Sequence, residues 1–166
     1  MTNNSDKKIG VLFVCLGNIC RSPSSQGIFQ RWVNEAGLED KFNVDSCGTA
    51  PFNVGKSPDP RTLQATKKYG YDISEQVARQ IQDSDFDTFD YILVMDRKNK
   101  MSVDAWTPNN FAGEVSLLMK YHPNSGGISQ IPDPYHEGIE AFYPIIETIE
   151  QATKSLFDQI VSKHNL

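Results

Sequence analysis

The feature that most limits how this chain can fold is an apolar run that leads directly into a tight loop and a helix start. Residues 9–14 (IGVLFV) are rich in β-branched and aromatic side chains, which is typical of a strand buried on both faces. The next segment, Cys15–Arg21, contains Gly and Asn, the residues that best tolerate a positive φ. Ser22 followed by Pro23 then predicts a helix N-cap and a first helical residue.

The rest of the chain repeats this alternation of strands and helices. Further strands are predicted at residues 42–47, 91–95 and 115–118. Helices are predicted from Ser22 to a stop at Gly37, from Asp59 to Tyr69, from Asp96 to Trp106, and along the apolar stripe of residues 145–160. Such alternation predicts a parallel sheet with helices on both faces, whose ligands bind beyond the carboxyl ends of the strands.

Length and composition restrict the class of protein. A chain of 166 residues suits one domain, which we assign to residues 8–166, with a disordered N-terminal tail at residues 1–7. The net charge of −5 argues against a nucleic-acid partner, which would need a basic surface. The longest apolar stretch, residues 9–16, is far below the roughly 20 residues of a membrane span. Three cysteines do not suggest a secreted disulfide framework, so we expect a cytoplasmic location.

The loop between the first strand and the first helix has the chemistry of an oxyanion site. Successive backbone N–H groups can form a concave nest there, to which the helix N-terminus adds its positive dipole end. Arg21 can close the nest with a planar guanidinium that binds two phosphate oxygens. A thiolate at Cys15 would be stabilised by these dipoles, and Ser22 could donate its hydroxyl to the sulfur. Against the phosphorus of a bound ester, such a thiolate is a nucleophile.

A leaving group that departs as an alkoxide or phenolate needs a proton, so the nest should face a general acid. Asp133, in the Gly- and Pro-rich residues 122–138, is the best candidate. Its rival Asp59 precedes Pro60 and a helical pattern, so it fits the role of a helix cap better. The alternative for Cys15 is simple packing, because cysteine is among the most buried residue types.

These residues resemble the phosphate-binding signature of the low-molecular-weight protein tyrosine phosphatases. The similar segments are residues 11–23 (VLFVCLGNICRSP), 45–46 (DS), 53–55 (NVG), 57–61 (SPDPR), 78–80 (ARQ), 89–92 (FDYI), 95–96 (MD) and 133–135 (DPY). They agree with the family in order and spacing over nearly the whole chain. The resemblance implies a single α/β domain with a four-stranded parallel twisted sheet and an N-terminal phosphate-binding loop.

The resemblance also implies a two-step hydrolysis of phosphotyrosine. Cys15 would attack phosphorus to form a cysteinyl phosphate, and Asp133 would protonate the leaving phenolate and then act as base for the hydrolytic water. Arg21 and the loop N–H groups would hold the equatorial oxygens, so no metal and no other cofactor is implied. The implied substrate-binding residues are Leu16, Gly17, Asn18, Ile19, Cys20, Ser22, Phe52, Asn53 and Tyr135.

The resemblance also implies a class of substrates and a disulfide partner for Cys15 within the loop. Phosphotyrosine-containing proteins or small aryl phosphates are the implied substrates, and phosphate-like oxyanions the implied competitive inhibitors. Phe52 and Tyr135 match aromatic walls of a slot that suits a phenyl ring and is too deep for phosphoserine. Cys20 matches a cysteine that in many relatives traps Cys15 in a reversible disulfide; a buried inert thiol is the alternative.

Two positions depart from the family pattern. Relatives often carry a histidine just before the Ala-Arg-Gln segment, where it contacts the loop asparagine. Gln76 stands in that region here, so either it replaces the contact or the contact is lost. The second of the tandem tyrosines that some relatives show after the Asp-Pro is His136 in this chain.

Two other functions remain open at this point. Protein-arginine phosphatases resemble the same loop but carry a threonine where Ile19 stands, and a bulky apolar side chain there favours an aromatic ring over a guanidinium. The second of these functions is that of a thiol redox or phosphate-binding protein without turnover. The presence of both Cys15 and Asp133 speaks against it, because a binding module needs neither.

Overall fold

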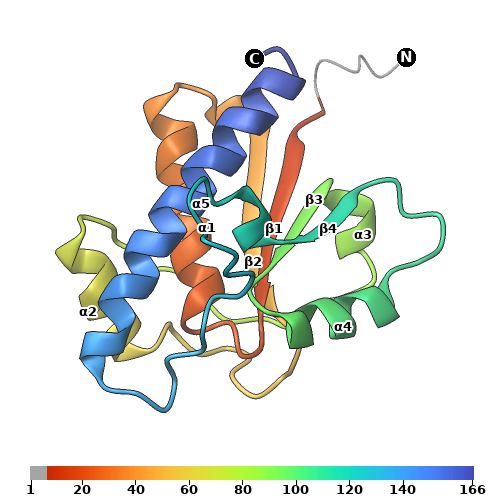
Figure 1. Cartoon of the computed structure of the whole chain (residues 1–166). Helices are drawn as coiled ribbons and strands as arrows, with labels where there is room; N and C mark the ends of the chain where they lie inside the picture. The colour runs from red at the N-terminus through yellow and green to blue at the C-terminus, as the bar shows by residue number, and fades with distance from the viewer. Residues whose placement is uncertain (1–6) are drawn as a thin grey trace.

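The computed structural model describes residues 7–166, and one sheet of four parallel strands forms its centre (Figure 1). The strands are β1 (Ile9–Cys15), β2 (Phe42–Gly48), β3 (Tyr91–Val94) and β4 (Glu114–Leu117). Their order across the sheet is β2-β1-β3-β4, so the first strand is central. The predicted α/β class with a four-stranded parallel sheet is confirmed. The predicted tail, residues 1–7, lies outside the described residues except for Lys7.

Helical segments connect these strands. The α-helices are α1 (Arg21–Glu35), α2 (Pro60–Lys68), α3 (Asp85–Thr88), α4 (Arg97–Trp106) and α5 (Phe142–Lys163). Short 3₁₀ turns are η2 (Glu39–Lys41), η3 (Leu118–Tyr121) and η4 (Ile139–Ala141). The long helices were all predicted. Helix α3 and the 3₁₀ turns were not, because three or four residues are too few to show a periodic pattern.

The helices cover both faces of the sheet, as the alternation predicted. Helices α1 and α5 pack together on one face, and α3 and α4 lie on the other (Figure 1). Alternate side chains of β1 point to opposite faces of the sheet. Val11 and Phe13 belong to the apolar cluster on the face of α1 and α5, and Leu12 and Val14 belong to the cluster on the face of α3 and α4. All four are fully buried, and burial of each stabilises the fold by roughly 1.5–3 kcal/mol. The central strand therefore holds its carboxyl end in a fixed place.

The helix boundaries confirm two predicted caps and correct one. Asp59 caps α2 by accepting from the Arg61 N–H, and Asp96 caps α4 in a capping box with Asn99. Ser22 is not the N-cap of α1, because the helix already begins at Arg21 and no side-chain oxygen accepts from its first turn. The Ser22 hydroxyl turns instead toward the end of β1, which leaves the first N–H groups of α1 available to a ligand.

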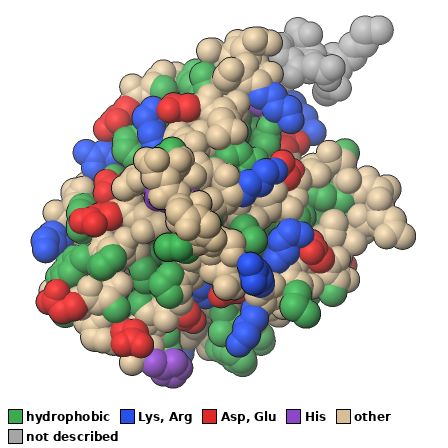
Figure 2. All heavy atoms as spheres, viewed as in Figure 1, with side chains coloured by type: hydrophobic (Ala, Val, Ile, Leu, Met, Phe, Trp, Pro, Cys, Tyr) green, Lys and Arg blue, Asp and Glu red, His purple; other side chains and the backbone are tan. Residues whose placement is uncertain are grey.

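One face of the molecule illustrates how charge is distributed on the surface (Figure 2). On the face shown in Figure 2, Lys and Arg side chains are intermingled with Asp and Glu. None of the helices in residues 7–166 is long and apolar enough to cross a membrane. The same residues contain no group of three or more His, Cys, Asp or Glu side chains arranged to hold a metal ion.

Candidate active site

The loop from Cys15 to Arg21 lies at the carboxyl end of β1, between the neighbouring strands β2 and β3. Asn18 has a φ of +56°, which turns the chain back so that its own N–H donates to Cys15 Sγ at 3.3 Å. Asn53 holds the outer side of the loop by donating to the Gly17 carbonyl at 3.2 Å. A Cβ on Gly17 would lie 2.6 Å from the Asn53 amide nitrogen, so a larger residue there would displace the Asn53 side chain.

The Asn18 side chain connects the loop to its surroundings from behind. Its amide donates to Ser22 Oγ at 2.8 Å and to Ser46 Oγ at 3.0 Å, and its oxygen accepts from the Arg79 N–H at 3.0 Å. Ser22 Oγ lies 3.0 Å from Cys15 Sγ. Because Ser22 accepts from Asn18, its own proton is left to donate, either to Cys15 Sγ or, at the longer distance of 3.4 Å, to the Cys47 carbonyl. Asn18 therefore orients the hydroxyl that faces the thiol.

Gln76 does not replace the histidine that relatives place near the loop asparagine. Its amide donates to the Pro23 carbonyl at 3.0 Å, and its buried oxygen has no partner in the described part of the chain. The Asn18 oxygen contacts the backbone N–H of Arg79, whose guanidinium is held by Asp45 at 3.0 Å and Asp85 at 2.9 Å.

Three free cysteines lie within residues 7–166, and all are buried. Desolvation raises the pKa of Cys20 to about 12, and it raises the pKa of Cys47 well above its ordinary value. Both are therefore neutral thiols at pH 7. Cys15 is the cysteine with a backbone N–H and a serine hydroxyl directed at its sulfur.

Arg21 is 2% exposed and crosses from the loop to the next strand. Its guanidinium donates to Asp96 Oδ2 at 2.7 Å and to the Ile131 carbonyl at 2.8 Å. Its second terminal nitrogen lies 3.6 Å from Asp133 Oδ2. A buried guanidinium needs such partners, and they leave it aimed at the mouth of the loop.

Asp133 differs from its rival Asp59 in exposure and partners. The Asp133 side chain is 42% exposed and accepts from the Tyr135 N–H at 3.1 Å. Asp59 is buried at the start of α2 and paired with Arg61 at 2.8 Å. The prediction that Asp59 caps a helix is confirmed.

The loop opens into a cavity of about 370 Å³. Its lining residues are Cys15, Leu16, Gly17, Ile19, Cys20, Arg21, Phe52, Asn53, Asp133, Tyr135 and His136. Phe52 and Tyr135 are 71% and 49% exposed, so both aromatic side chains line the cavity where it meets solvent. Of the predicted site residues only Asn18 and Ser22 are missing from the lining, because both are buried behind the loop.

Two residues of this site were not predicted. Asp96 was interpreted as a helix cap alone, although it also pairs with Arg21; the signal was its position directly after β3, at the same sheet edge. His136 was identified only as a departure from the family pattern, and it lines the cavity beside Tyr135 with ring centroids 5.0 Å apart.

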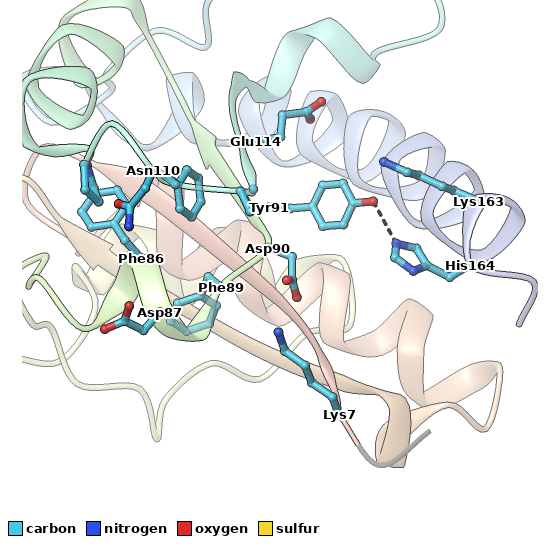
Figure 3. A pocket seen from close by; sticks show the side chains of 14 residues that line it. Lys7, Phe86, Asp87, Phe89, Asp90, Tyr91, Asn110, Glu114, Lys163 and His164 are labelled. Atoms are coloured by element: carbon cyan, nitrogen blue, oxygen red, sulfur yellow. Dashed lines mark hydrogen bonds between the residues drawn. The ribbon is translucent and has the colours of Figure 1, made fainter. Parts of the chain in front are cut away.

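A second cavity, of about 570 Å³, lies at the amino ends of the strands (Figure 3). Charged side chains from several elements surround it, among them Lys7, Asp90, Glu114 and His164. None of the predicted site residues borders it.

Comparison with known proteins places this architecture in one family. The family model described as "Low molecular weight phosphotyrosine protein phosphatase" matches residues 10–166. A Schizosaccharomyces pombe protein with the same description is 46% identical over 138 residues, which span 82% of this chain and 86% of that protein.

Solved structures also match the fold of this chain over nearly its whole length. A protein tyrosine phosphatase from Entamoeba histolytica has a TM-score of 0.89 and 30% identity, covering 96% of this chain and 100% of its own. The structure of a Drosophila arginine phosphatase has a TM-score of 0.83 and 31% identity, covering 90% of this chain and 96% of its own. The chain therefore belongs to the low-molecular-weight phosphotyrosine protein phosphatase family.

Proposed function

We propose that this protein hydrolyses phosphotyrosine through a cysteinyl-phosphate intermediate. The observation that carries the proposal is the position of Cys15 Sγ, which accepts from the Asn18 N–H and meets the Ser22 hydroxyl at the floor of the cavity. Arg21 and Asp133 face the same cavity from its side. A nucleophile, an oxyanion clamp and a proton donor thus share one space.

In the first step the loop N–H groups and Arg21 hold the phosphoryl oxygens while the Cys15 thiolate attacks phosphorus. The S–P bond forms as the bond from phosphorus to the phenolic oxygen breaks. Asp133, in its protonated form, gives its proton to that oxygen, so the product leaves as a neutral phenol. Because Asp133 stands at the exposed edge of the cavity, it can reach the leaving group rather than the buried sulfur.

In the second step Asp133, now a carboxylate, takes a proton from water as the water oxygen attacks phosphorus. The S–P bond breaks, inorganic phosphate leaves, and the sulfur departs as a thiolate. The Ser22 hydroxyl, oriented by Asn18, stabilises that thiolate. Arg21 and the uncapped start of α1 supply the positive potential that the phosphoryl oxygens need in both steps, so the proposed mechanism uses no metal.

The walls of the cavity favour an aryl phosphate. Phe52 and Tyr135 can flank a phenyl ring that reaches down to Cys15, whereas phosphoserine would be too short. Phosphotyrosine-containing proteins or small aryl phosphates are therefore the proposed substrates, and phosphate-like oxyanions the proposed competitive inhibitors. The three free cysteines support a cytoplasmic location, where thiols stay reduced.

A protein-arginine phosphatase is the second candidate. It is favoured by the similarity to the structure named Drosophila arginine phosphatase. The apolar Ile19 in the cavity lining opposes it, because a guanidinium would lose water there without gaining a hydrogen-bond acceptor.

The test is phosphate release, in excess EDTA, from matched peptides that carry phosphotyrosine or phosphoarginine. Wild-type protein should release phosphate from the phosphotyrosine peptide, and Cys15→Ser should release none. Release from the phosphoarginine peptide alone would replace the proposed substrate. Release by the Cys15→Ser variant would remove the cysteinyl-phosphate mechanism.

A further inference from the structure

We infer that Arg61 is a positioning residue, which holds the segment bearing Asp133 in register with the phosphate-binding loop. The inference rests on the proposed function, because it assigns a role in placing the general acid. Arg61 does not line the cavity and lies in the first turn of α2.

On one side, Arg61 is anchored to the phosphate-binding loop through Asp59. Its Nε and one terminal nitrogen donate to the two Asp59 carboxylate oxygens at 3.0 and 2.8 Å. The hydrogen bond from the guanidinium lowers the pKa of Asp59, so this carboxyl is charged at neutral pH. The Asp59 N–H in turn donates to the Ile19 carbonyl of the loop at 2.9 Å.

On the other side, Arg61 holds two carbonyl groups that follow Asp133 in the chain. One terminal nitrogen donates to the Tyr135 carbonyl at 2.9 Å and the other to the Glu137 carbonyl at 2.5 Å. The guanidinium carbon also lies 4.7 Å from the centre of the Phe142 ring. The Arg61 guanidinium thus connects three parts of the chain: the loop, through Asp59; the residues that follow Asp133; and the start of α5.

Asp133 depends on such support, because few contacts fix its own side chain. Its carboxylate accepts from the Tyr135 N–H and lies at the longer distance of 3.6 Å from Arg21. It belongs to residues 122–138, which form turns and extended chain without a helix or a strand. A shift of about 1 Å in a catalytic group can cost about 100-fold in rate, so loss of the Arg61 contacts should act through the acid.

The structure offers a matched control in Arg97. It holds the same segment on the N-terminal side of Asp133, where the Arg97 side chain donates to Ser129 Oγ at 3.1 Å and the Arg97 backbone N–H donates to Gln130 at 2.8 Å. Both arginines tie residues 122–138 to a helix start, but only Arg61 binds the carbonyls that follow Asp133.

The experiment measures kcat/KM for phenyl phosphate and p-nitrophenyl phosphate with wild type, Arg61→Ala, Arg61→Lys and Arg97→Ala. This parameter reports the step in which the phenol leaves. For Arg61→Ala we expect phenyl phosphate to lose about tenfold or more and p-nitrophenyl phosphate, the better leaving group, clearly less. Arg61→Lys should show the same pattern, because an ammonium cannot span the four acceptors. Arg97→Ala should resemble wild type.

Inhibition by inorganic phosphate reports whether the loop is intact, since Asp133 is not needed to bind it. It should stay within about twofold of wild type in both Arg61 variants. In the Asp133→Ala background, Arg61→Ala should add little further loss, because the acid it positions is gone. Equal losses for both esters, or a full additional loss in the double variant, would overturn the inference while leaving phosphotyrosine hydrolysis by wild type in place. A wild type that hydrolyses neither ester would overturn the proposed function and this inference together.

Discussion

The two ends of the central sheet both carry a cavity, and the larger one is not the candidate active site. The amino-end cavity has a volume of about 570 Å³ and the carboxyl-end cavity about 370 Å³. Both contain aromatic, acidic and basic side chains. Volume and composition therefore do not distinguish a site of chemistry from a gap between elements; the orientation of hydrogen-bond donors does.

At the amino end, polar groups satisfy one another. Asp90 accepts from the Gly10 N–H at 2.8 Å, and its carbonyl accepts from the Glu114 N–H at 2.8 Å. The Tyr91 hydroxyl lies 3.0 Å from His164 Nε2, and Figure 3 shows these two side chains pointing toward one another. These hydrogen bonds connect the first residues of the strands to neighbouring segments. The polar groups that make them therefore stabilise the fold.

At the carboxyl end, the hydrogen-bond donors of the loop are arranged differently. The chain leaves β1 and enters α1 without a side-chain cap, and the Asn18 N–H is directed at a sulfur rather than a carbonyl. A strand-to-helix connection places a helix N-terminus, with its positive potential, at this edge, and the opposite edge receives helix C-termini. The chain direction in a parallel sheet therefore decides which cavity can bind an oxyanion.

The largest expected effect is that of Cys15→Ser, which removes the nucleophile. Turnover of an aryl phosphate should fall by about 10⁴-fold or more, because a serine hydroxyl at this position has no general base to activate it. Inhibitor binding to the folded variant, followed as protection against heat by inorganic phosphate, should persist since the loop donors remain. Turnover within tenfold of wild type would mean that another group attacks phosphorus.

Asp133→Ala should have the next largest effect. A general acid contributes about 10²–10⁴-fold, and the loss should be greatest for phenyl phosphate, whose leaving group needs the proton most. The measurement is kcat/KM across a series of substituted phenyl phosphates. Asp104→Asn is the matched control, because that carboxyl is about as exposed as Asp133, pairs with Lys100 on α4 and does not line the cavity. Equal losses across the series would contradict the acid role of Asp133.

A smaller effect is expected from Asp96→Asn, which sharpens the comparison between the two edges. Asparagine also caps helices, so α4 should survive, but the ion pair that orients Arg21 at 2.7 Å becomes a neutral hydrogen bond. We expect inhibition by phosphate to weaken about tenfold and kcat/KM to fall by a similar factor. Asp90→Asn, the equivalent change at the amino edge, should leave both values unchanged. An equal effect of the two substitutions would mean that Asp96 acts only through stability.

The contrast between Asp96 as a cap and Asp96 as a partner of Arg21 shows what a sequence can predict. A cap is local: Asp96 and Asn99 are three residues apart, and the pattern is visible in the chain. The pair with Arg21 spans 75 residues and exists because β3 lies beside β1 in the sheet. Strand order is a property of the packed fold, and no local pattern encodes it.

Ser22 was predicted both as a helix N-cap and as a partner of the Cys15 sulfur. The helix begins one residue earlier, so the cap prediction is wrong, and the hydroxyl lies 3.0 Å from the sulfur, as the second prediction requires. The loop between β1 and α1 was predicted in the right place because its residues are contiguous. Its supports were not, since Ser46 and Arg79 come from distant segments that the fold brings behind Asn18.

The smallest expected effect tests the amino-end cavity directly. His164→Ala removes the bond to the Tyr91 hydroxyl, which should cost about 0.5–1.5 kcal/mol of stability and lower Tm by a few degrees. Tyr91→Phe should cost the same, and the double variant no more than either, because both remove one bond. Thermal unfolding and kcat/KM on the same samples check this. We expect activity within twofold of wild type in all three, since these side chains fasten the end of α5 to the start of β3 and face away from the phosphate-binding loop. A drop in activity larger than the loss of folded protein would show that the two edges are coupled, and the amino-end cavity would then belong to the functional part of the molecule.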